Sequence, residues 1–134
     1  MINDLAATSG STPGKTLLDE TLIVAMGEFG RTVGTVNNQA GRDHYLQQSV
    51  VFAGGGTKGG SVIGATSATG AYTLDPGWER NRSIRPEDIA ATIYSALGID
   101  WTTVRHDDPF GRGFEYIPFA ASDDAYGPVN AIFT

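Results

Sequence analysis

The sequence contains no cysteine, and its acidic side chains outnumber its basic ones. The absence of cysteine excludes disulfide bonds and zinc sites built on thiolates. Lys and Arg number 9 against 15 Asp and Glu, so the formal net charge is −6 at pH 7. This balance is atypical of a nucleic-acid-binding domain, which normally presents a basic face. No apolar run approaches the ~20 residues that a membrane-spanning helix needs. We therefore expect neither a nucleic-acid partner nor a membrane span.

Glycine, by contrast, is abundant, with 18 in a chain of 134 residues. The glycines follow no fixed period, which predicts many tight turns rather than a fibrous repeat. Hydrophobic residues make up 40 % of the chain, which argues against general disorder and suits one small core. We expect a single domain over residues 1–134, with residues 1–20 as a leading loop and residues 113–134 as a loop-rich tail.

Short apolar runs predict strands at 21–27 ("TLIVAMG") and at 49–56 ("SVVFAGGG"). Their length and their Ile and Val content favour strands buried on both faces, as in a parallel sheet. A further short strand is expected at 61–63. Together with one helix, this order predicts an α/β fold with a mainly parallel sheet. Ligands of such folds bind beyond the carboxyl ends of the strands, and the loops that follow both runs are expected there.

The expected helix lies in "SIRPEDIAATIYSALGID" at 83–100. Pro86 suits the first helical position, where the missing N–H has no helical partner to lose. Gly98 suits the left-handed residue that ends a helix. Ile89, Ile93 and Leu97 recur every four residues, which predicts a single apolar stripe along the helix.

Five chemically active side chains occur in two short stretches, "GEFGRT" at 27–32 and "GRDHY" at 41–45. Glu28, Asp43 and His44 offer oxygen and nitrogen ligands for a divalent metal ion such as Zn²⁺, Ca²⁺ or Mg²⁺. Arg31 and Arg42 carry planar guanidinium groups that match phosphate, sulfate or carboxylate. A cation beside an anion clamp is the equipment for hydrolysing a phosphate or sulfate ester.

The same residues permit a purely structural interpretation. Glu28 with Arg42, or Asp43 with Arg31, could form ion pairs at the end of a strand, and such pairs are common. In a hydrolase, His44 could instead serve as an acid toward the leaving group, because histidine titrates close to neutral pH. The residues alone do not decide between these alternatives.

Four segments carry a family resemblance: "LLDETLIVAMGEFGRT", "GRDHY", "SVVFAGGGTKGGSVIGAT" and "RPEDIAATIYSALGID". In this order they resemble the DUF1501 family, over roughly residues 10–112. That family is similar to sulfatases and to the alkaline phosphatase superfamily. The resemblance implies the C-terminal part of a three-layer α/β domain of the alkaline phosphatase type. It further implies a metal-dependent hydrolase of sulfate or phosphate esters, acting on an anionic small molecule or polysaccharide ester.

The resemblance also assigns roles to particular positions. Glu28 falls at the position of a metal-binding Asp, Phe29 at that of a metal-binding His, and His44 near a later His ligand. Phe29 cannot bind metal, so a site with fewer metals or altered geometry is implied. The nucleophile and the other ligands would belong to a missing N-terminal part of the domain, and this chain alone would be inactive. An export signal is common in the family, which implies a periplasmic or extracellular setting.

Three other motifs each permit two interpretations. "GSTPGKT" at 10–16 resembles a phosphate-binding P-loop, but Ser9 stands where the first glycine belongs, and a plain loop is expected. "AGGGTKGG" at 53–60 either exposes backbone amides to an anion or makes a tight exit from a strand. "HDD" at 106–108 is either a second metal site or a pair that orients a loop.

Two further functions stay open beside the hydrolase. One is an exported binding or structural protein of the same fold whose metal site has decayed. The other is a nucleotide-binding α/β module.

Overall fold

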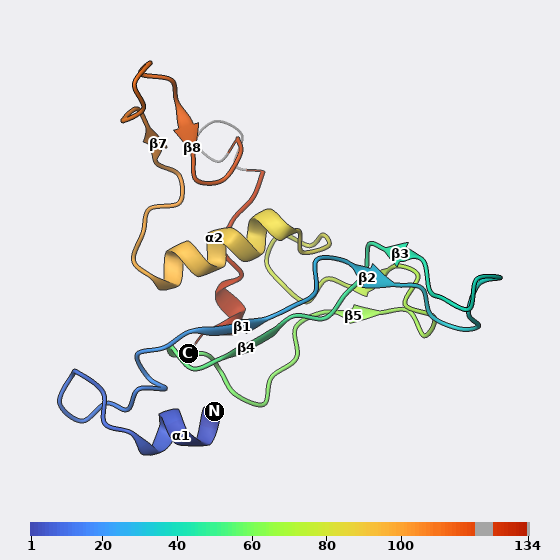
Figure 1. The fold of residues 1–134 in the computed structure, drawn as a ribbon, viewed down its shortest axis with the longest axis horizontal. Helices are drawn as coiled ribbons and strands as arrows, with labels where there is room; N and C mark the ends of the chain where they lie inside the picture. The colour runs from blue at the N-terminus through green and yellow to red at the C-terminus, as the bar shows by residue number, and fades with distance from the viewer. Residues whose placement is uncertain (120–124, 134) are drawn as a thin grey trace. The chain divides into compact units, whose positions relative to one another are not determined.

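A computed structural model describes residues 1–119 and 125–133, and it divides into two compact units. Unit 1 comprises residues 1–83 and 131–134, and unit 2 comprises residues 84–130. Figure 1 shows the elements of both units along the chain. Each unit is considered by itself below.

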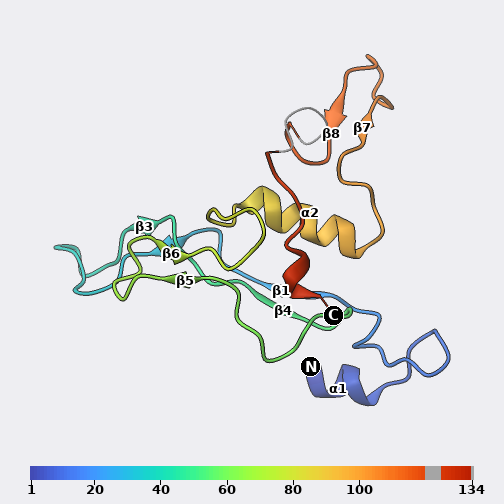
Figure 2. The ribbon, with the colours of Figure 1, turned by 180° about the vertical axis from the view of Figure 1, so that it is seen from behind.

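Unit 1 begins with helix α1 (Ile2–Ala7) and is built around the strands β1 (Ile23–Ala25) and β4 (Val51–Ala53). These two strands pair in antiparallel register, with Ile23 opposite Ala53 and Ala25 opposite Val51. Figures 1 and 2 show them running side by side as a ribbon from both directions of view. The predicted strands at 21–27 and 49–56 therefore exist, in shorter form.

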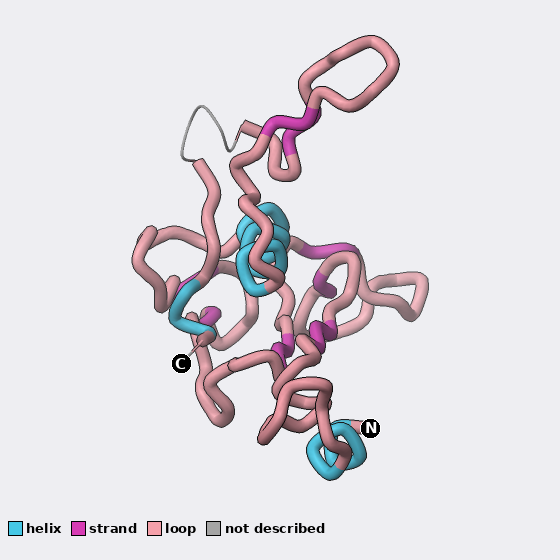
Figure 3. The backbone as a smooth tube through the Cα atoms, turned by 90° about the vertical axis from the view of Figure 1, so that its left-hand side faces the viewer, coloured by secondary structure: helices cyan, strands magenta, loops and turns pink. Residues whose placement is uncertain are grey.

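The remaining strands form three more antiparallel pairs. In unit 1, β2 (Gly30–Arg31) pairs with β3 (His44–Tyr45), and β5 (Ala65–Thr66) pairs with β6 (Thr73–Asp75). In unit 2, β7 (Val104–Arg105) pairs with β8 (Phe114–Glu115). The short strand expected at 61–63 lies instead at 65–66. The described backbone is otherwise largely loop, as Figure 3 shows, with the short 3-10 helix η1 at Asn130–Ile132.

The prediction of a three-layer α/β domain with a mainly parallel sheet is wrong for the described residues. All of their sheets are two-stranded and antiparallel. A parallel pair needs a long crossover connection, usually a helix. The described residues between β1 and β4 hold the β2–β3 hairpin and no helix, so the chain turns back and the strands meet in opposite directions.

The antiparallel pairing also changes where the loops lie. Glu28 follows β1 at one end of the ribbon, while the glycine run at 53–60 follows β4 at the other end. The two loops therefore do not share one edge of a sheet, as a parallel arrangement would require. Nor are the strands buried on both faces, since Val51 is 58 % exposed.

Helix α2 (Pro86–Ala96) in unit 2 confirms the predicted helix and its boundaries. Pro86 occupies the first turn, and Arg85 precedes the helix in an extended conformation. The Arg85 backbone N–H donates to the Asp88 carboxylate at 2.8 Å, which closes the first turn. Beyond the last turn, Gly98 adopts a left-handed φ of 71°, the conformation that glycine reaches at least cost.

The buried face of α2 differs from the predicted stripe. Asp88, Ala91 and Thr92 are fully buried, whereas Leu97 is 62 % exposed. Thr92 and Asp88 can be buried because their polar groups are hydrogen-bonded, which removes the usual cost. Ile89 is also buried, at 8 % exposed, and Ile93 is half-buried, so the buried face overlaps the predicted stripe at its start and departs from it at Leu97.

The core of unit 2 is small and centres on Ala91 and Ile117. Trp101 and Tyr126 are among the partly buried side chains that pack against it. The Val129 backbone N–H donates to Thr92 Oγ1 at 2.9 Å, so the residues after the gap at 120–124 return to α2.

Unit 1 buries little apolar surface. Among its described residues, Trp78 is the only large apolar side chain that is buried. Several others are well exposed, and they include Val33, Leu46, Val51, Val62, Tyr72 and Leu74. An isolated two-stranded ribbon is at best marginally stable, so unit 1 depends on its hydrogen-bonded loops.

Candidate functional site

The β2–β3 hairpin carries most of the side chains that the sequence singles out. Arg31 on β2 lies directly opposite His44 on β3. Gly30, the buried residue beside Arg31, allows the hairpin to close. A Cβ at Gly30 would overlap the carbonyl oxygen of Gln47, so only glycine permits this approach of the two chains.

Arg31 and Arg42 brace the hairpin reciprocally. Arg31 Nη1 donates to the backbone carbonyl of Arg42 at 2.9 Å. Arg42 Nη1 donates to the carbonyl of Thr32 at 2.8 Å. Each guanidinium thus donates one hydrogen bond across the hairpin and keeps further N–H donors in an exposed position. The expected ion pairs with Glu28 and Asp43 do not occur among the described residues.

The His44 ring stacks on Phe29, with ring centroids 3.7 Å apart and planes inclined by 28°. The Arg31 guanidinium lies over the Phe29 ring, 4.7 Å from its centroid. Phe29, His44, Tyr45 and Leu46 line an open pocket of about 290 Å³. Phe29 therefore fixes the position of both the imidazole and one guanidinium.

Asn37 organises the loop that holds Arg42 and Asp43. Its amide donates to Asp43 Oδ1 at 2.9 Å, and its carbonyl oxygen accepts from the Gly41 and Gln39 N–H groups at 3.0 Å. Glu28 is exposed and makes no hydrogen bond or ion pair with another described residue. Asp43 is thus tied into the loop, and Glu28 is not.

The metal assignment to Glu28, Asp43 and His44 gains no support from this geometry. No three or more His, Asp or Glu side chains within residues 1–119 and 125–133 lie close enough together to hold a metal ion. The three residues share one short hairpin region, but Asp43 faces Asn37 and His44 faces Phe29. A metal site that includes them stays a prediction.

A carboxylate of the same chain accepts hydrogen bonds from the P-loop-like stretch at 10–16. Glu20 accepts hydrogen bonds from Ser11 N at 2.7 Å, Ser11 Oγ at 2.9 Å and Thr12 N at 2.7 Å. Hydrogen bonding by the Thr12 side chain, followed by the backbone N–H groups of Ser11 and Thr12, lowers the pKa of Glu20 to about 2. The amides that would face a phosphate in a P-loop are therefore occupied, in agreement with a plain loop.

The glycine run makes a tight exit from β4. Gly54, Gly55 and Gly56 all have positive φ. A Cβ at Gly54 would overlap the Thr21 carbonyl oxygen and meet Leu18 O at 2.7 Å. Gly54 and Gly55 therefore serve the close approach of two chain segments, whereas Gly56 has open space around it.

The side chains of the "HDD" stretch have separate partners. Asp107 pairs with Arg105, and Asp108 Oδ2 pairs with Arg112 Nε at 3.1 Å. The His106 Nδ1 atom lies 3.2 Å from the Gly111 carbonyl oxygen. The three side chains therefore brace the β7–β8 hairpin at different points.

Sequence reasoning missed the roles of Phe29 and Asn37. Phe29 was treated as a lost metal ligand, whereas it is the platform under His44. The turn-forming composition of "NNQAG" at 37–41 was the available signal for Asn37. No local pattern marks Phe29, because its partner is fifteen positions away on the other strand of the hairpin.

The DUF1501 family, described as a protein of unknown function, matches residues 14–115 of this chain. Since this range covers most of the 134 residues, the chain belongs to the DUF1501 family. No curated protein and no solved structure gives a significant match to the chain. The described part of the chain contains no helix that is both long and apolar enough to cross a membrane.

Proposed function

We propose that the β2–β3 hairpin binds the oxyanion of a sulfate or phosphate ester, as part of a metal-dependent ester hydrolase. The reciprocal bracing of Arg31 and Arg42 carries the proposal. It holds two guanidinium groups on one hairpin with no carboxylate partner among the described residues. Braced guanidiniums lose little entropy when they bind a tetrahedral anion, and each offers charge-assisted hydrogen bonds.

In this proposal Arg31 and Arg42 hold the charge that develops on the transferred group. His44 would be one ligand of the metal ion in this proposal, and its stack on Phe29 keeps the ring in one orientation. The substrate is an anionic small molecule or a polysaccharide ester. The nucleophile is supplied by protein outside the described residues.

A divalent ion such as Zn²⁺, Ca²⁺ or Mg²⁺ would supply Lewis-acid chemistry to such a hydrolase. Glu28, Asp43 and His44 do not by themselves make a three-ligand group. We therefore assign the metal's remaining ligands, like the nucleophile, to protein outside the described residues. By the family resemblance this is the N-terminal part of the domain. The many exposed apolar side chains of unit 1 support a further packing partner of this kind.

Calorimetric titration with inorganic sulfate and phosphate tests the anion site directly. Arg31→Gln and Arg42→Gln should each weaken binding by about tenfold or more, since a charge-assisted hydrogen bond contributes about 1.5–3 kcal/mol. Arg112→Gln removes the same charge from unit 2 and should leave the affinity unchanged. Equal losses of affinity in all three variants would show that only the net charge of the chain matters, which would overturn the proposal.

A non-catalytic binding or structural protein is the second candidate, and Phe29 favours it. By the resemblance to sulfatases and alkaline phosphatases its ring falls at the position of a metal-binding His, and it packs against His44 instead. Titration with Zn²⁺, Ca²⁺ and Mg²⁺ separates the two candidates. Stoichiometric metal that is lost in His44→Ala supports the hydrolase, whereas anion binding without any metal binding supports the second candidate.

A further inference from the structure

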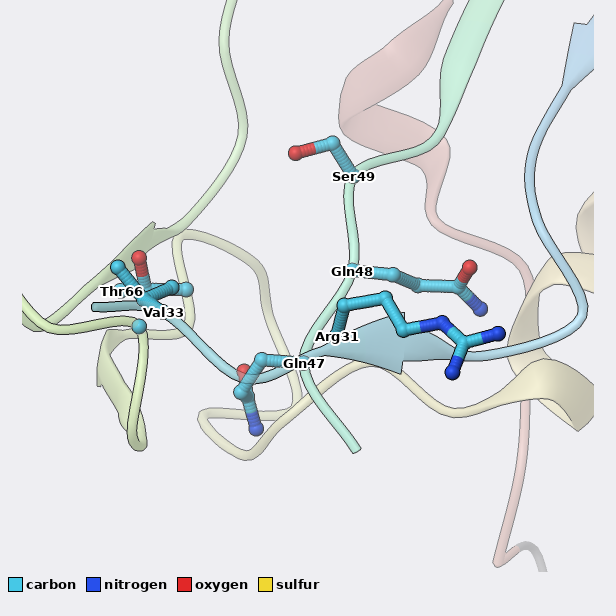
Figure 4. A pocket seen from close by; sticks show the side chains of 7 residues that line it. Arg31, Val33, Gln47, Gln48, Ser49 and Thr66 are labelled. Atoms are coloured by element: carbon cyan, nitrogen blue, oxygen red, sulfur yellow. The ribbon is translucent and has the colours of Figure 1, made fainter. Parts of the chain in front are cut away.

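A second pocket, of about 170 Å³, lies beside Arg31 in unit 1. Figure 4 shows its lining: Arg31 comes from β2, Gln47, Gln48 and Ser49 follow β3, and Thr66 belongs to β5. Arg31 thus belongs both to the proposed anion site and to this pocket. The pocket is distinct from the one formed by Phe29 and His44.

Hydrogen bonds between loops hold the walls of this pocket together. Thr73 Oγ1 donates to Gln47 Oε1 at 3.1 Å, and the Tyr45 hydroxyl donates to the Ala71 carbonyl at 2.7 Å. A Cβ at Gly70 would lie 2.9 Å from Val33 Cγ2, so glycine is needed for the β5–β6 turn to approach the hairpin. These contacts join the segment after β3 and the β5–β6 turn to the β2–β3 hairpin beside the pocket.

The chemistry of this lining is unusual for an acidic protein. It contains one cation, two amides, two hydroxyls, the apolar side chain of Val33 and no carboxylate. The hydroxyls of Ser49 and Thr66 have no hydrogen-bond partner among the described residues, and Gln48 Oε1 is buried without one. The Gln47 amide nitrogen remains a donor, because Thr73 occupies only its oxygen. Unpaired amides and hydroxyls of this kind match a ligand that carries several hydroxyl groups.

We propose that this pocket binds the sugar ring of a sugar phosphate or sugar sulfate whose charged group is held by Arg31. The inference rests on the proposed function, because it needs the oxyanion to lie at the Arg31 and Arg42 guanidiniums. The amides and hydroxyls pair with the ring hydroxyls, and the absence of carboxylates keeps the pocket open to an anion. The substrate class is thereby narrowed from an anionic small molecule or polysaccharide ester to a saccharide ester.

Binding of the 134-residue chain to five probes tests the inference: glucose 6-phosphate, glucose 6-sulfate, inorganic phosphate, inorganic sulfate and glucose. Each sugar ester should bind about tenfold tighter than its inorganic ion, since two or three neutral hydrogen bonds add that much. Combined Ser49→Ala and Thr66→Val substitutions should weaken binding of the sugar esters by about threefold to tenfold. The inorganic ions should bind the double variant as before. Thr35→Val, which removes a hydroxyl outside the pocket, should change nothing.

The outcomes separate this inference from the proposed function. If sugar esters and inorganic ions bind equally, the saccharide pocket is overturned and the anion site stands. If glucose binds as tightly as its esters, and the double variant weakens it, the pocket holds a neutral sugar, and both the anion site and the sugar-ester inference are overturned. If none of the five probes binds, both are overturned.

Discussion

The carboxylate of Asp88 accepts a hydrogen bond from the backbone N–H of Gly127, 39 positions further along the chain, at 3.1 Å. The same side chain accepts from Arg85 N at the start of α2. One fully buried carboxylate thus joins the first turn of the helix to the segment that returns after residue 124. We expect this residue to be decisive for the stability of unit 2.

Asp88→Ala should lower the free energy of unfolding by about 1–3 kcal/mol, because it leaves two backbone N–H groups without their acceptor. Denaturant unfolding followed by circular dichroism measures the change. Ser95→Ala, an exposed position on the same helix, is the control and should be nearly neutral. An unchanged midpoint for Asp88→Ala would contradict the assigned role.

Thr92→Val should cost a similar amount although it preserves the shape of the side chain. The hydroxyl donates to the Asp88 carbonyl at 2.6 Å and accepts from Val129 N at 2.9 Å, in a fully buried position. Valine buries the Val129 N–H without an acceptor, which costs about 1–3 kcal/mol. Thr92→Ser keeps the hydroxyl and should retain slow amide exchange at Val129. Fast exchange in Thr92→Ser but not in Thr92→Val would reverse the interpretation.

The loop at 10–16 should respond to acid at an unusually low pH. The pKa of Glu20 is about 2 in the folded chain, compared with an ordinary value of 4.5. Since the folded pKa is the lower one, the stabilisation is complete above pH ~4.5 and is lost as the pH falls toward 2. NMR titration of the Glu20 carboxyl carbon should give a midpoint near 2, with the Ser11 and Thr12 amide signals moving in parallel.

Glu20→Gln provides the control for this titration. The Ser11 and Thr12 amide signals should shift at neutral pH in this variant and should no longer titrate at low pH. A Glu20 midpoint close to 4.5 in the unmodified chain would show that the carboxylate does not bind these amides in solution.

Gly30→Ala should open the β2–β3 hairpin. The added methyl group would overlap the Gln47 carbonyl oxygen, so the strands must separate and the Phe29–His44 stack must break. We expect loss of the ring-current shifts of the His44 protons and of anion binding together. Gly41→Ala lies in the same hairpin and would meet only Asn37 Oδ1 at 3.7 Å, so it should preserve both. Retained anion binding in Gly30→Ala would show that the hairpin does not hold the site.

Local patterns in the sequence predicted the helix well. Proline at its start and glycine after its end act within a few residues, so the boundaries of α2 could be read directly. The strand positions at 23–25 and 51–53 were also found, because apolar runs between turns mark strands locally. The direction of their pairing was not found, since it depends on the path of the residues between them.

Local patterns also singled out side chains of the candidate site. Arg31, Arg42 and His44 were singled out by residue type, and the structure brings them onto one hairpin. Their partners could not be read from spacing: the arginines bond to backbone carbonyls, and His44 stacks on Phe29. The polar pocket beside Arg31 draws on β2, the end of β3 and β5, and no single segment reveals it.

The sequence by itself determined the family, the helix with its ends, and the residue types available for binding an anion. These follow from short-range preferences and from composition, which each segment carries without its neighbours. Only the tertiary structure decided that the strands run antiparallel, that Asp88 and Thr92 are buried, and that one pocket gathers amides and hydroxyls around Arg31. Those features are set by contacts between residues far apart in the chain, because burial and pairing belong to the packed backbone and not to any one stretch of it.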